Sequence, residues 1–345
     1  MTPPAWRAVR AWLRVRRWLL LTLLVAAAPF LAGALQFLRH GVPELLFTGD
    51  GAVLEIRTLH AAHGRQLLGP YSRFLWSHPG PAFFYLALPV YELCREHGPG
   101  LNLFVLLANF AATTALVLTA RRLRGDLYAL AVAVLLVVYE TLGAPFPLSG
   151  EWNPMTPVLP LALLVFLCAR LGTGETRALA AVAFIASAIV QTHLGFAPSA
   201  AYLVATGLLF CGRELLVQDA PTASDRRRPL RSLAVAAGVV VLLWTLPVYE
   251  NLSRPDGNLR TLRLFFSQPH RAEHTWKVAA EIVAGQLAIF PAALARALGR
   301  GTMSVGETGR HLLAGGQLLG LGAGMVVALR RRDQPAALLA AMALG

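Results

Sequence analysis

Charged residues are scarce in this chain of 345 residues, where Asp, Glu, Lys and Arg make up 14% of the positions and hydrophobic residues 56%. Lysine is almost missing, since 30 of the 31 basic residues are arginine and only Lys277 is lysine. This bias suggests GC-rich coding and favours a bacterial source. So apolar a composition excludes an ordinary soluble domain and is typical of a polytopic membrane protein.

Acidic residues are fewer still, 18 against 31 basic ones. The excess does not indicate nucleic acid as a partner, because the arginines stand in short clusters at the ends of apolar runs and form no stripe. Cysteine is also rare, and Cys94, Cys168 and Cys211 lack CxxC spacing. This argues against a disulfide framework and a zinc site. We infer no cofactor and no metal ion.

Apolar runs of about 20 residues predict membrane-spanning helices. The first, residues 18–38, follows five arginines, and the run 101–120 ends in three more. Because basic residues stay on the cytoplasmic side, the N-terminus is expected inside and the loop 39–100 outside. The first run is longer than a signal-peptide core and no clean cleavage site follows it, which favours a retained anchor.

Later runs continue this alternation, at residues 127–141, 155–169, 178–190, 196–210, 233–249 and 311–329. We take the piece 278–297 as an outer or re-entrant helix, since a full span there would put the arginines at 330–332 outside. Cytoplasmic parts then hold 18 arginines and 6 acids, and outer parts hold 13 basic residues and 12 acids. The fold class predicted is all-α, a polytopic transmembrane helix bundle of about eight or nine spans.

One membrane domain covers residues 1–345 in this interpretation. Its first outer loop, 39–100, carries a short interfacial helix at 81–94, too short to cross, with Phe83, Tyr85 and Tyr91 at headgroup depth. A cytoplasmic loop occupies 213–232, and a second long outer loop occupies 250–310. A further apolar run is unfinished at the last residue, as in a truncated chain or the membrane part of a longer one.

The outer helix ends hold the residues that could perform chemistry. Asp50 stands at a predicted helix start, where it is either an N-cap or a general base at the membrane surface. Glu55 lies about 140° further around an ideal helix, so a paired-carboxylate site is disfavoured. His78 stands in the sequence WSHPGP of the same loop.

Two later connections carry further polar groups. Glu151 and Asn153 flank Trp152, a set that either binds a sugar or anchors a turn at the interface. His193 ends the next outward run, where a solvated loop histidine is the simpler alternative. Arg57 and Arg73 can pair with the phosphate of a lipid-linked substrate, or are attracted to lipid headgroups.

The order of these parts resembles the GT-C-type glycosyltransferases that use polyprenyl-phosphate-linked sugars, including protein mannosyltransferase-like and aminoarabinose-transferase-like proteins. The likeness rests on the basic first span, Asp50 in the outer loop, the His-Pro turn at 76–81, the aromatic stretch FFYL at 83–86 and the second span ending in ARRL at 120–123. It covers about the first 200 residues.

If the resemblance holds, it implies sugar transfer from a polyprenyl-phosphate donor to an acceptor hydroxyl, with Asp50 as general base. Arg57 or Arg73 would stabilise the departing phosphate, and Glu151 resembles a second-loop acid that positions the acceptor or a metal. His78, Asn153 and His193 complete the expected substrate-binding set.

The expected partners are a lipid-linked sugar, membrane lipids and a glycan or protein acceptor. The site would lie on the outer face of a bacterial inner membrane. A transporter or flippase for lipid-linked glycans, or an assembly subunit without catalysis, is the alternative. A transporter should show ionisable residues at the midplane or repeats of broken helices, and the polar groups here cluster at outer helix ends.

Overall fold

The computed structural model describes residues 5–40, 49–143, 148–217, 223–268, 275–297 and 307–344. Within these ranges every regular element is a helix, apart from one isolated antiparallel bridge between Tyr71 and Ser77. The all-α prediction is therefore confirmed. Parts of both predicted outer loops, at 41–48, 269–274 and 298–306, lie outside the described residues, as does Gly345.

The helices follow one another along the chain, and a long connection, residues 63–81, lies between α2 and α3. In chain order they are α1 (Ala5–His40), α2 (Asp50–Ala62), α3 (Ala82–Leu93), α4 (Pro99–Arg124), α5 (Asp126–Val138), the π-helical η1 (Tyr139–Gly143), α6 (Val158–Gly172), the 3₁₀ turn η2 (Thr176–Ala178), α7 (Leu179–Thr192), the 3₁₀ turn η3 (Leu194–Phe196), α8 (Ala197–Val217), α9 (Ala223–Ser253), α10 (Asn258–Ser267), α11 (Trp276–Ala297), α12 (Glu307–Arg330) and α13 (Gln334–Leu344).

Five helical stretches among the described residues are long and apolar enough to cross a membrane. They are Arg16–Phe37, Pro99–Arg124, Leu194–Val217, Arg228–Ser253 and His311–Arg330. Other apolar helices are shorter, such as α6 with 15 residues. At a rise of 1.5 Å per residue α6 is about 22 Å long, less than the hydrocarbon core of about 30 Å. Membrane-spanning helices are thus supported, whereas a total of eight or nine spans stays a prediction.

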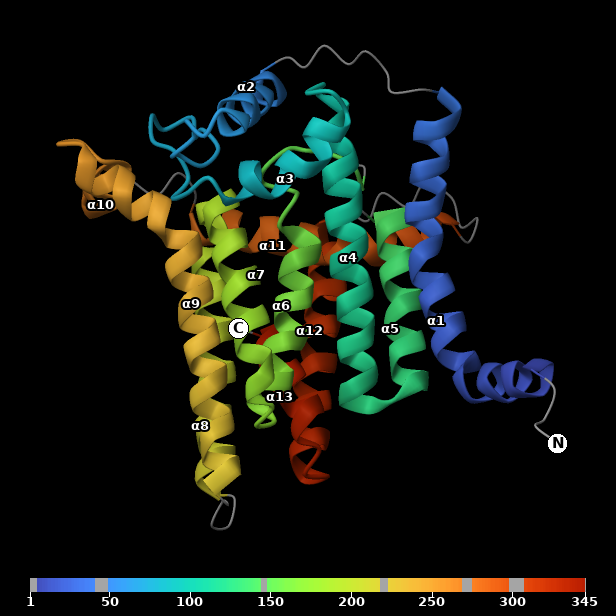
Figure 1. Cartoon of the computed structure of the whole chain (residues 1–345). Coiled ribbons are helices and arrows are strands. Elements are labelled where there is room, and N and C mark those ends of the chain that lie inside the picture. The colour runs from blue at the N-terminus through green and yellow to red at the C-terminus, as the bar shows by residue number, and fades with distance from the viewer. Residues whose placement is uncertain are drawn as a thin grey trace.

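Most of the long helices stand side by side in one bundle, whereas α11 runs across it and α2 and α3 lie across one of its ends (Figure 1). The bundle core is apolar, and α6 packs in its middle against α4, α7, α8 and α13. Leu116, Leu164 and Ile189, from α4, α6 and α7, are almost completely buried there.

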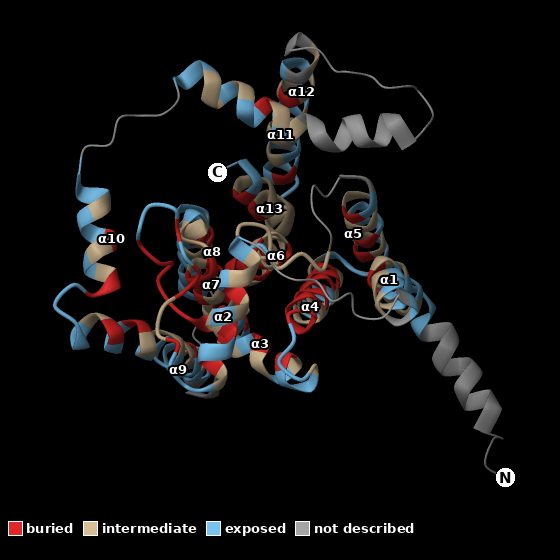
Figure 2. Cartoon of the chain, turned by 90° about the horizontal axis from the view of Figure 1, so that it is seen from above, coloured by how far each residue is buried: buried red, intermediate tan, exposed pale blue. Residues whose placement is uncertain are grey.

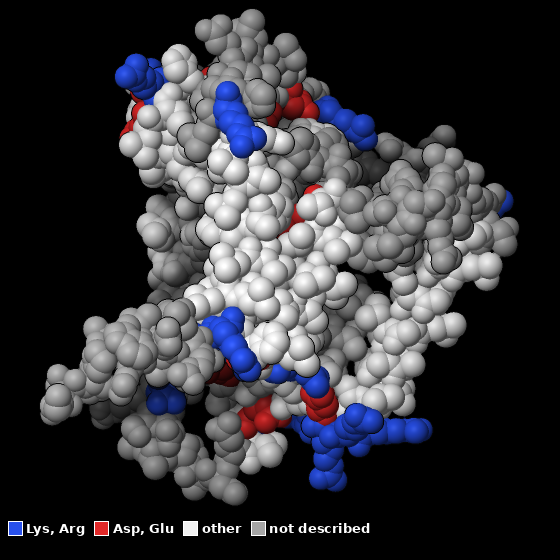
Figure 3. Space-filling model, turned by 90° about the vertical axis from the view of Figure 1, so that its right-hand side faces the viewer, with Lys and Arg blue, Asp and Glu red and all other residues white. Residues whose placement is uncertain are grey.

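Charge separates the two ends of the bundle from its middle. The end opposite α2 and α3 carries the arginines that close α4 and α12, and there Arg124 Nη1 lies 2.6 Å from Asp333 Oδ2. Figure 3 shows basic side chains at both ends of the visible face and a largely uncharged band between them. Such a band is what spanning helices present to lipid.

The expected interfacial helix at 81–94 is α3, which covers Ala82–Leu93. Its aromatic side chains differ from the expectation, because Phe83 and Tyr91 are only 4% and 1% exposed. They pack between α2 and α4, and Figure 2 shows α2 beside α3 when the bundle is viewed from this end. These rings therefore belong to a small core and do not face outward.

The segment 213–232, expected as a loop, is largely helical in the described residues. Helix α8 continues to Val217 and α9 begins at Ala223. Arginine is a good helix former, so a helix can continue beyond its apolar stretch into an arginine-rich end.

Candidate functional site

A hairpin loop (residues 69–78) precedes α3 and forms one side of the candidate site. Its two strands are joined by backbone hydrogen bonds from Gly69 N to His78 O (3.1 Å), from His78 N to Pro70 O (2.8 Å) and from Ser72 N to Trp76 O (2.9 Å). This pairing leaves few unpaired backbone groups in a loop without helix or sheet. It fixes the side chains of Trp76 and His78 relative to each other.

Two glycines, Gly69 in the hairpin loop and Gly80 just after it, let this segment approach the end of α7. A Cβ atom on Gly69 would lie 2.5 Å from His78 O, and one on Gly80 would lie 2.3 Å from Gln191 Oε1. Gln191 is completely buried, and its Oε1 accepts a hydrogen bond from Ala82 N at the start of α3 (3.3 Å). The loop is thus clamped to the same end of the bundle that carries His193.

Arg57 supports the hairpin loop from α2. Its Nη1 donates to Gly69 O and to Ser77 Oγ, the latter at 3.2 Å. Burial lowers the pKa of Arg57, but a guanidinium stays charged in proteins. Arg57 therefore adds positive charge behind the loop.

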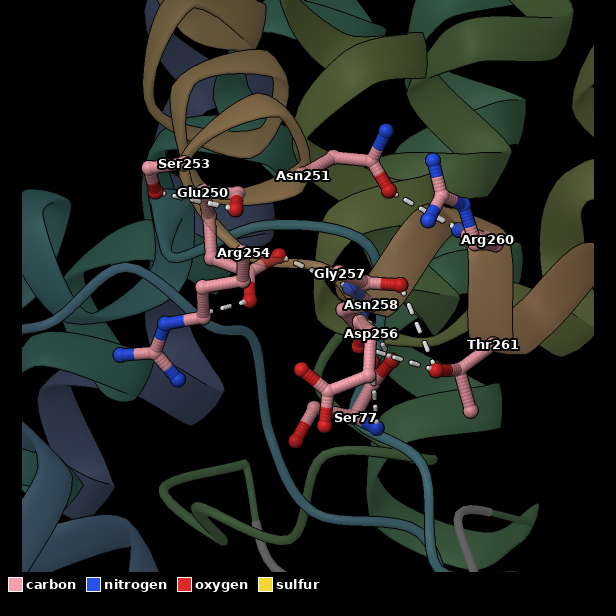
Figure 4. Close-up of polar contacts among 10 residues, drawn as sticks. All are labelled: Ser77, Glu250, Asn251, Ser253, Arg254, Asp256, Gly257, Asn258, Arg260 and Thr261. Carbon is pink, nitrogen blue, oxygen red and sulfur yellow. Dashed lines mark hydrogen bonds and ion pairs between the residues drawn. The ribbon is translucent and has the colours of Figure 1, made fainter.

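Asn258, the first residue of α10, holds the other side of the loop (Figure 4). Its Oδ1 accepts from Ser77 N at 3.0 Å and its Nδ2 donates to Ser77 O at 2.8 Å. Asn258 N in turn donates to Glu250 Oε2 at 2.9 Å, at the end of α9. An amide that satisfies both groups of one peptide residue acts as a specific clamp between elements distant in the chain.

A cavity of about 740 Å³ opens between the hairpin loop, the start of α2, the segment before α6 and the turn between α7 and α8. A volume of this size is in the range of small-molecule sites. Its wall consists of polar groups and aromatic rings: Asp50, Tyr71, Ser72, Arg73, Phe74, Trp76, His78, Trp152, Asn153, Pro154, His193, Leu194, Gly195, Ala197, Pro198 and Phe266.

Most of the residues expected from the sequence meet in this wall. Asp50, Arg73, His78, Asn153 and His193 line the cavity, although they come from three separate connections of the chain. The other two expected residues lie elsewhere: Arg57 is behind the hairpin loop, as described above, and Glu151 is turned toward α4.

Asp50 is held by the indole of Trp152, whose Nε1 donates to Asp50 Oδ2 at 3.1 Å. Asp50 is not the N-cap of α2, because Gly49 takes that position and Asp50 lies in the first turn. A carboxylate there is favoured by the helix dipole. Asp50 is exposed, so it remains free to meet a ligand in the cavity.

Glu151 and Asn153 fasten the segment before α6. Glu151 Oε2 accepts from Asn102 Nδ2 on α4 at 2.6 Å, and Asn153 Nδ2 donates to Thr192 O at 3.3 Å. These bonds place Trp152 between two anchored neighbours. Trp152 is therefore presented to Asp50 by a fixed backbone.

His78 and His193 face each other, with ring centroids 4.6 Å apart. His78 Nδ1 accepts a hydrogen bond from Leu194 N at 3.0 Å, while His193 Nδ1 is enclosed without a partner among the described residues. Burial, then His193 and then Arg57 lower the pKa of His78 to about 3. Burial also lowers the pKa of His193. Both rings are therefore neutral at pH 7.

An aromatic cluster closes the cavity on the side of α10. The ring of Trp76 lies 5.8 Å from that of Phe265, 6.2 Å from that of Phe266 and 6.2 Å from that of Phe74. Arg73 lies over the ring of Phe74, 4.9 Å from its centroid. Such contacts orient a cation while leaving its other donors free.

A second, apolar cavity of about 460 Å³ lies beside the first, between α3, α4, α6 and α7. Phe83, Phe104, Leu163 and Ile185 are among the residues of its wall, and Thr192 belongs to it as well. Because Thr192 O accepts from Asn153 of the polar cavity, one residue layer separates the two spaces.

Four residues that build this site are not in the set expected from the sequence: Trp76, Gln191, Asn258 and Trp152, the last as the partner of Asp50. Each lies next to a turn or a helix end that the sequence does mark. Their partners, however, are up to 181 positions away along the chain. Only tertiary packing identifies them.

Comparison with models of protein families, with curated proteins and with solved structures finds no match to this chain. Within the described ranges, no three His, Cys, Asp or Glu side chains gather as a metal site would require.

Proposed function

We propose that the chain is an integral membrane glycosyltransferase that moves a sugar from a polyprenyl-phosphate-linked donor to an acceptor hydroxyl at the outer face of the membrane. The observation that carries this proposal is the cavity of about 740 Å³, where Asp50, Arg73 and two neutral histidines meet at the end of a bundle of apolar helices. The resemblance of the first part of the chain to GT-C-type enzymes supports it.

Asp50 is the general base in this proposal. The acceptor oxygen attacks the anomeric carbon, its proton passes to the Asp50 carboxylate, and the bond between that carbon and the phosphate oxygen breaks with its electron pair on the phosphate. A positioned base of this kind contributes about 10²–10⁴-fold in rate. Arg73, in the same wall, offers its guanidinium to the phosphate.

The apolar cavity suits the polyprenyl part of the donor. Its wall is almost entirely hydrocarbon, and it lies one residue layer from the polar cavity. An isoprenoid chain buried there would gain about 25 cal/mol per Å² of apolar surface removed from water. The phosphate would then lie on the polar side of the layer that Thr192 and Asn153 form, and this layer would have to open for the isoprenoid chain to pass.

The test is transfer from a panel of labelled polyprenyl-phosphate sugars, in membranes that contain the full chain. We expect Asp50→Asn to reduce turnover by at least about 100-fold, because the amide cannot accept the proton. The matched control is Glu55→Gln on the same helix, whose carboxylate does not line the cavity, and it should retain activity.

Equal turnover by a stably inserted Asp50→Asn variant would remove Asp50 from the mechanism. Movement of the unaltered donor across the bilayer, without any transfer, would instead support the flippase alternative. Sugar transfer and movement of the donor across the bilayer can both be measured in the same membranes when the donor carries a label on its sugar and another on its lipid.

A further inference from the structure

In both histidines of the cavity the ring nitrogen that carries the proton is Nε2. His78 Nδ1 accepts from Leu194 N, so the proton of the neutral ring is on Nε2. His193 Nδ1 is enclosed without a partner among the described residues. A buried N–H without an acceptor is costly, so this ring also carries its proton on Nε2.

Both histidines line the cavity, and their Nε2 atoms are the ring nitrogens that are left to donate. Among the described residues neither has a hydrogen-bond partner, and neither is enclosed as His193 Nδ1 is. The two rings line the same wall with centroids 4.6 Å apart. The cavity therefore contains two adjacent N–H donors that await an oxygen acceptor.

Positive charge surrounds this pair. Arg57 lies behind His78 and acts on it electrostatically, and Arg73 lines the cavity from the hairpin loop. Asp50 adds one negative charge to the same wall and keeps it when Trp152 donates to its carboxylate, whereas Glu250, which accepts from Asn258 N, does not line the cavity. Two guanidinium groups therefore stand against one carboxylate. Tyr71 of the hairpin loop is the remaining titratable group in the wall. An anion is the acceptor that such a field favours.

We propose that His78 and His193 form a two-donor oxyanion site for the phosphate of a lipid-linked substrate. The inference rests on the proposed function and adds the residues and the protonation state that recognise its phosphate. Neutral donors suit a phosphate group, because N–H bonds to a charged oxygen are about twice as strong as bonds between neutral groups.

The site would act during transfer as well as in binding. When the bond between the anomeric carbon and the phosphate oxygen breaks, the electron pair stays on that oxygen and the phosphate gains one negative charge. Two fixed donors stabilise this charge without reorganisation, in the manner of an oxyanion hole. No proton needs to leave either ring.

The experiment measures binding of farnesyl phosphate to the purified full chain in nanodiscs by calorimetry, with inorganic phosphate and farnesol as comparison ligands. The variants are His78→Asn and His193→Asn. In each, the asparagine Oδ1 can take the place of Nδ1, so the bond from Leu194 N is retained in the first variant, but no Nε2 donor remains. We expect each to weaken binding about tenfold or more.

His63→Asn is the matched control, since His63 is exposed at the C-cap of α2, does not line the cavity, and its Nδ1 contacts Leu59 O at 2.9 Å. It should bind farnesyl phosphate as the wild type does, and farnesol should bind more weakly than farnesyl phosphate. Wild-type affinity in both cavity variants, or no binding of farnesyl phosphate by the wild type, overturns the inference. Equal affinity for inorganic phosphate overturns the assignment to a lipid.

The outcome is separable from that of the proposed function. Histidine-dependent binding of farnesyl phosphate in a chain that transfers no sugar would leave the oxyanion site standing and reject the transferase. Sugar transfer by the wild type, together with normal binding of farnesyl phosphate by the histidine variants, would support the transferase and reject the oxyanion site.

Discussion

At the residue scale, Asp50 depends on a contact that neither its own helix nor its own loop provides. The indole of Trp152, 102 positions later in the chain, donates to its carboxylate. Helix α2 brings Asp50 to the cavity by its first turn, and Trp152 fixes the side chain there. A general base must be held within reach of the proton that it removes, so this bond matters for the proposed chemistry.

Trp152→Phe should therefore impair turnover more than substrate binding. Loss of a hydrogen bond to a buried charged group costs about 1.5–3 kcal/mol, which corresponds to a rate reduced tenfold or more. The cost is smaller for an exposed carboxylate such as Asp50. We expect kcat to fall about 3–30-fold with KM little changed. Steady-state kinetics of the transfer reaction measure both parameters.

The control is Trp244→Phe, which removes another indole bond, from Trp244 Nε1 to Ser187 Oγ at 3.1 Å, away from the cavity. It should leave the ratio of kcat to KM unchanged. If Trp152→Phe raises KM and leaves kcat intact, Trp152 binds substrate and does not position Asp50.

At the element scale, the hairpin loop is positioned by close packing against α7 and α9. The space at Gly80 is filled by Gln191 Oε1 and by Pro247 Cγ, which an added Cβ would approach to 2.3 and 2.5 Å. Gln191 also donates to Leu243 O of α9 at 2.9 Å. The small size of Gly80 therefore allows the segment before α3 to pack against both α7 and α9.

Gly80→Ala should destabilise the protein, because overpacking of a tight site costs about 1–3 kcal/mol. Thermal unfolding in detergent should show a lower Tm, together with weaker binding in the cavity. Gly238→Ala is the control on α9, where no atom lies within 4 Å of the added methyl. It should be neutral or slightly stabilising, because alanine is the better helix former. A Gly80→Ala variant as stable as wild type would contradict the packing argument.

The same elements show what the sequence can and cannot predict. Pro81 precedes the apolar run of α3 and the charged residues Arg95 and Glu96 end it, so the expected helix at 81–94 agrees with Ala82–Leu93. The inward direction of Phe83 and Tyr91 was not predictable, because it depends on α2 covering α3. Asn258 contacts Ser77 across 181 positions, and no local pattern marks such a bond.

At the scale of the whole molecule, the bundle has two chemically different ends. One end carries the hairpin loop, α2 and the cavity; the other carries the arginines at the ends of α4 and α12. The arginine clusters are visible in the sequence alone, and in the fold those of α4 and α12 lie at one end. The positive-inside rule then predicts that the cavity faces outward.

Cysteine labelling in intact cells tests this orientation. Leu75, at the tip of the hairpin loop, is 85% exposed and belongs to the cavity end, whereas Arg331 is exposed just after α12 at the other end. The background is a chain with Cys94, the half-buried native cysteine, replaced by serine; Cys168 and Cys211 are buried. We expect an impermeant maleimide to label Leu75→Cys in intact cells and Arg331→Cys only after permeabilisation. The opposite pattern would place the cavity in the cytoplasm, where an acceptor and a lipid-linked donor would have to meet on the inner leaflet.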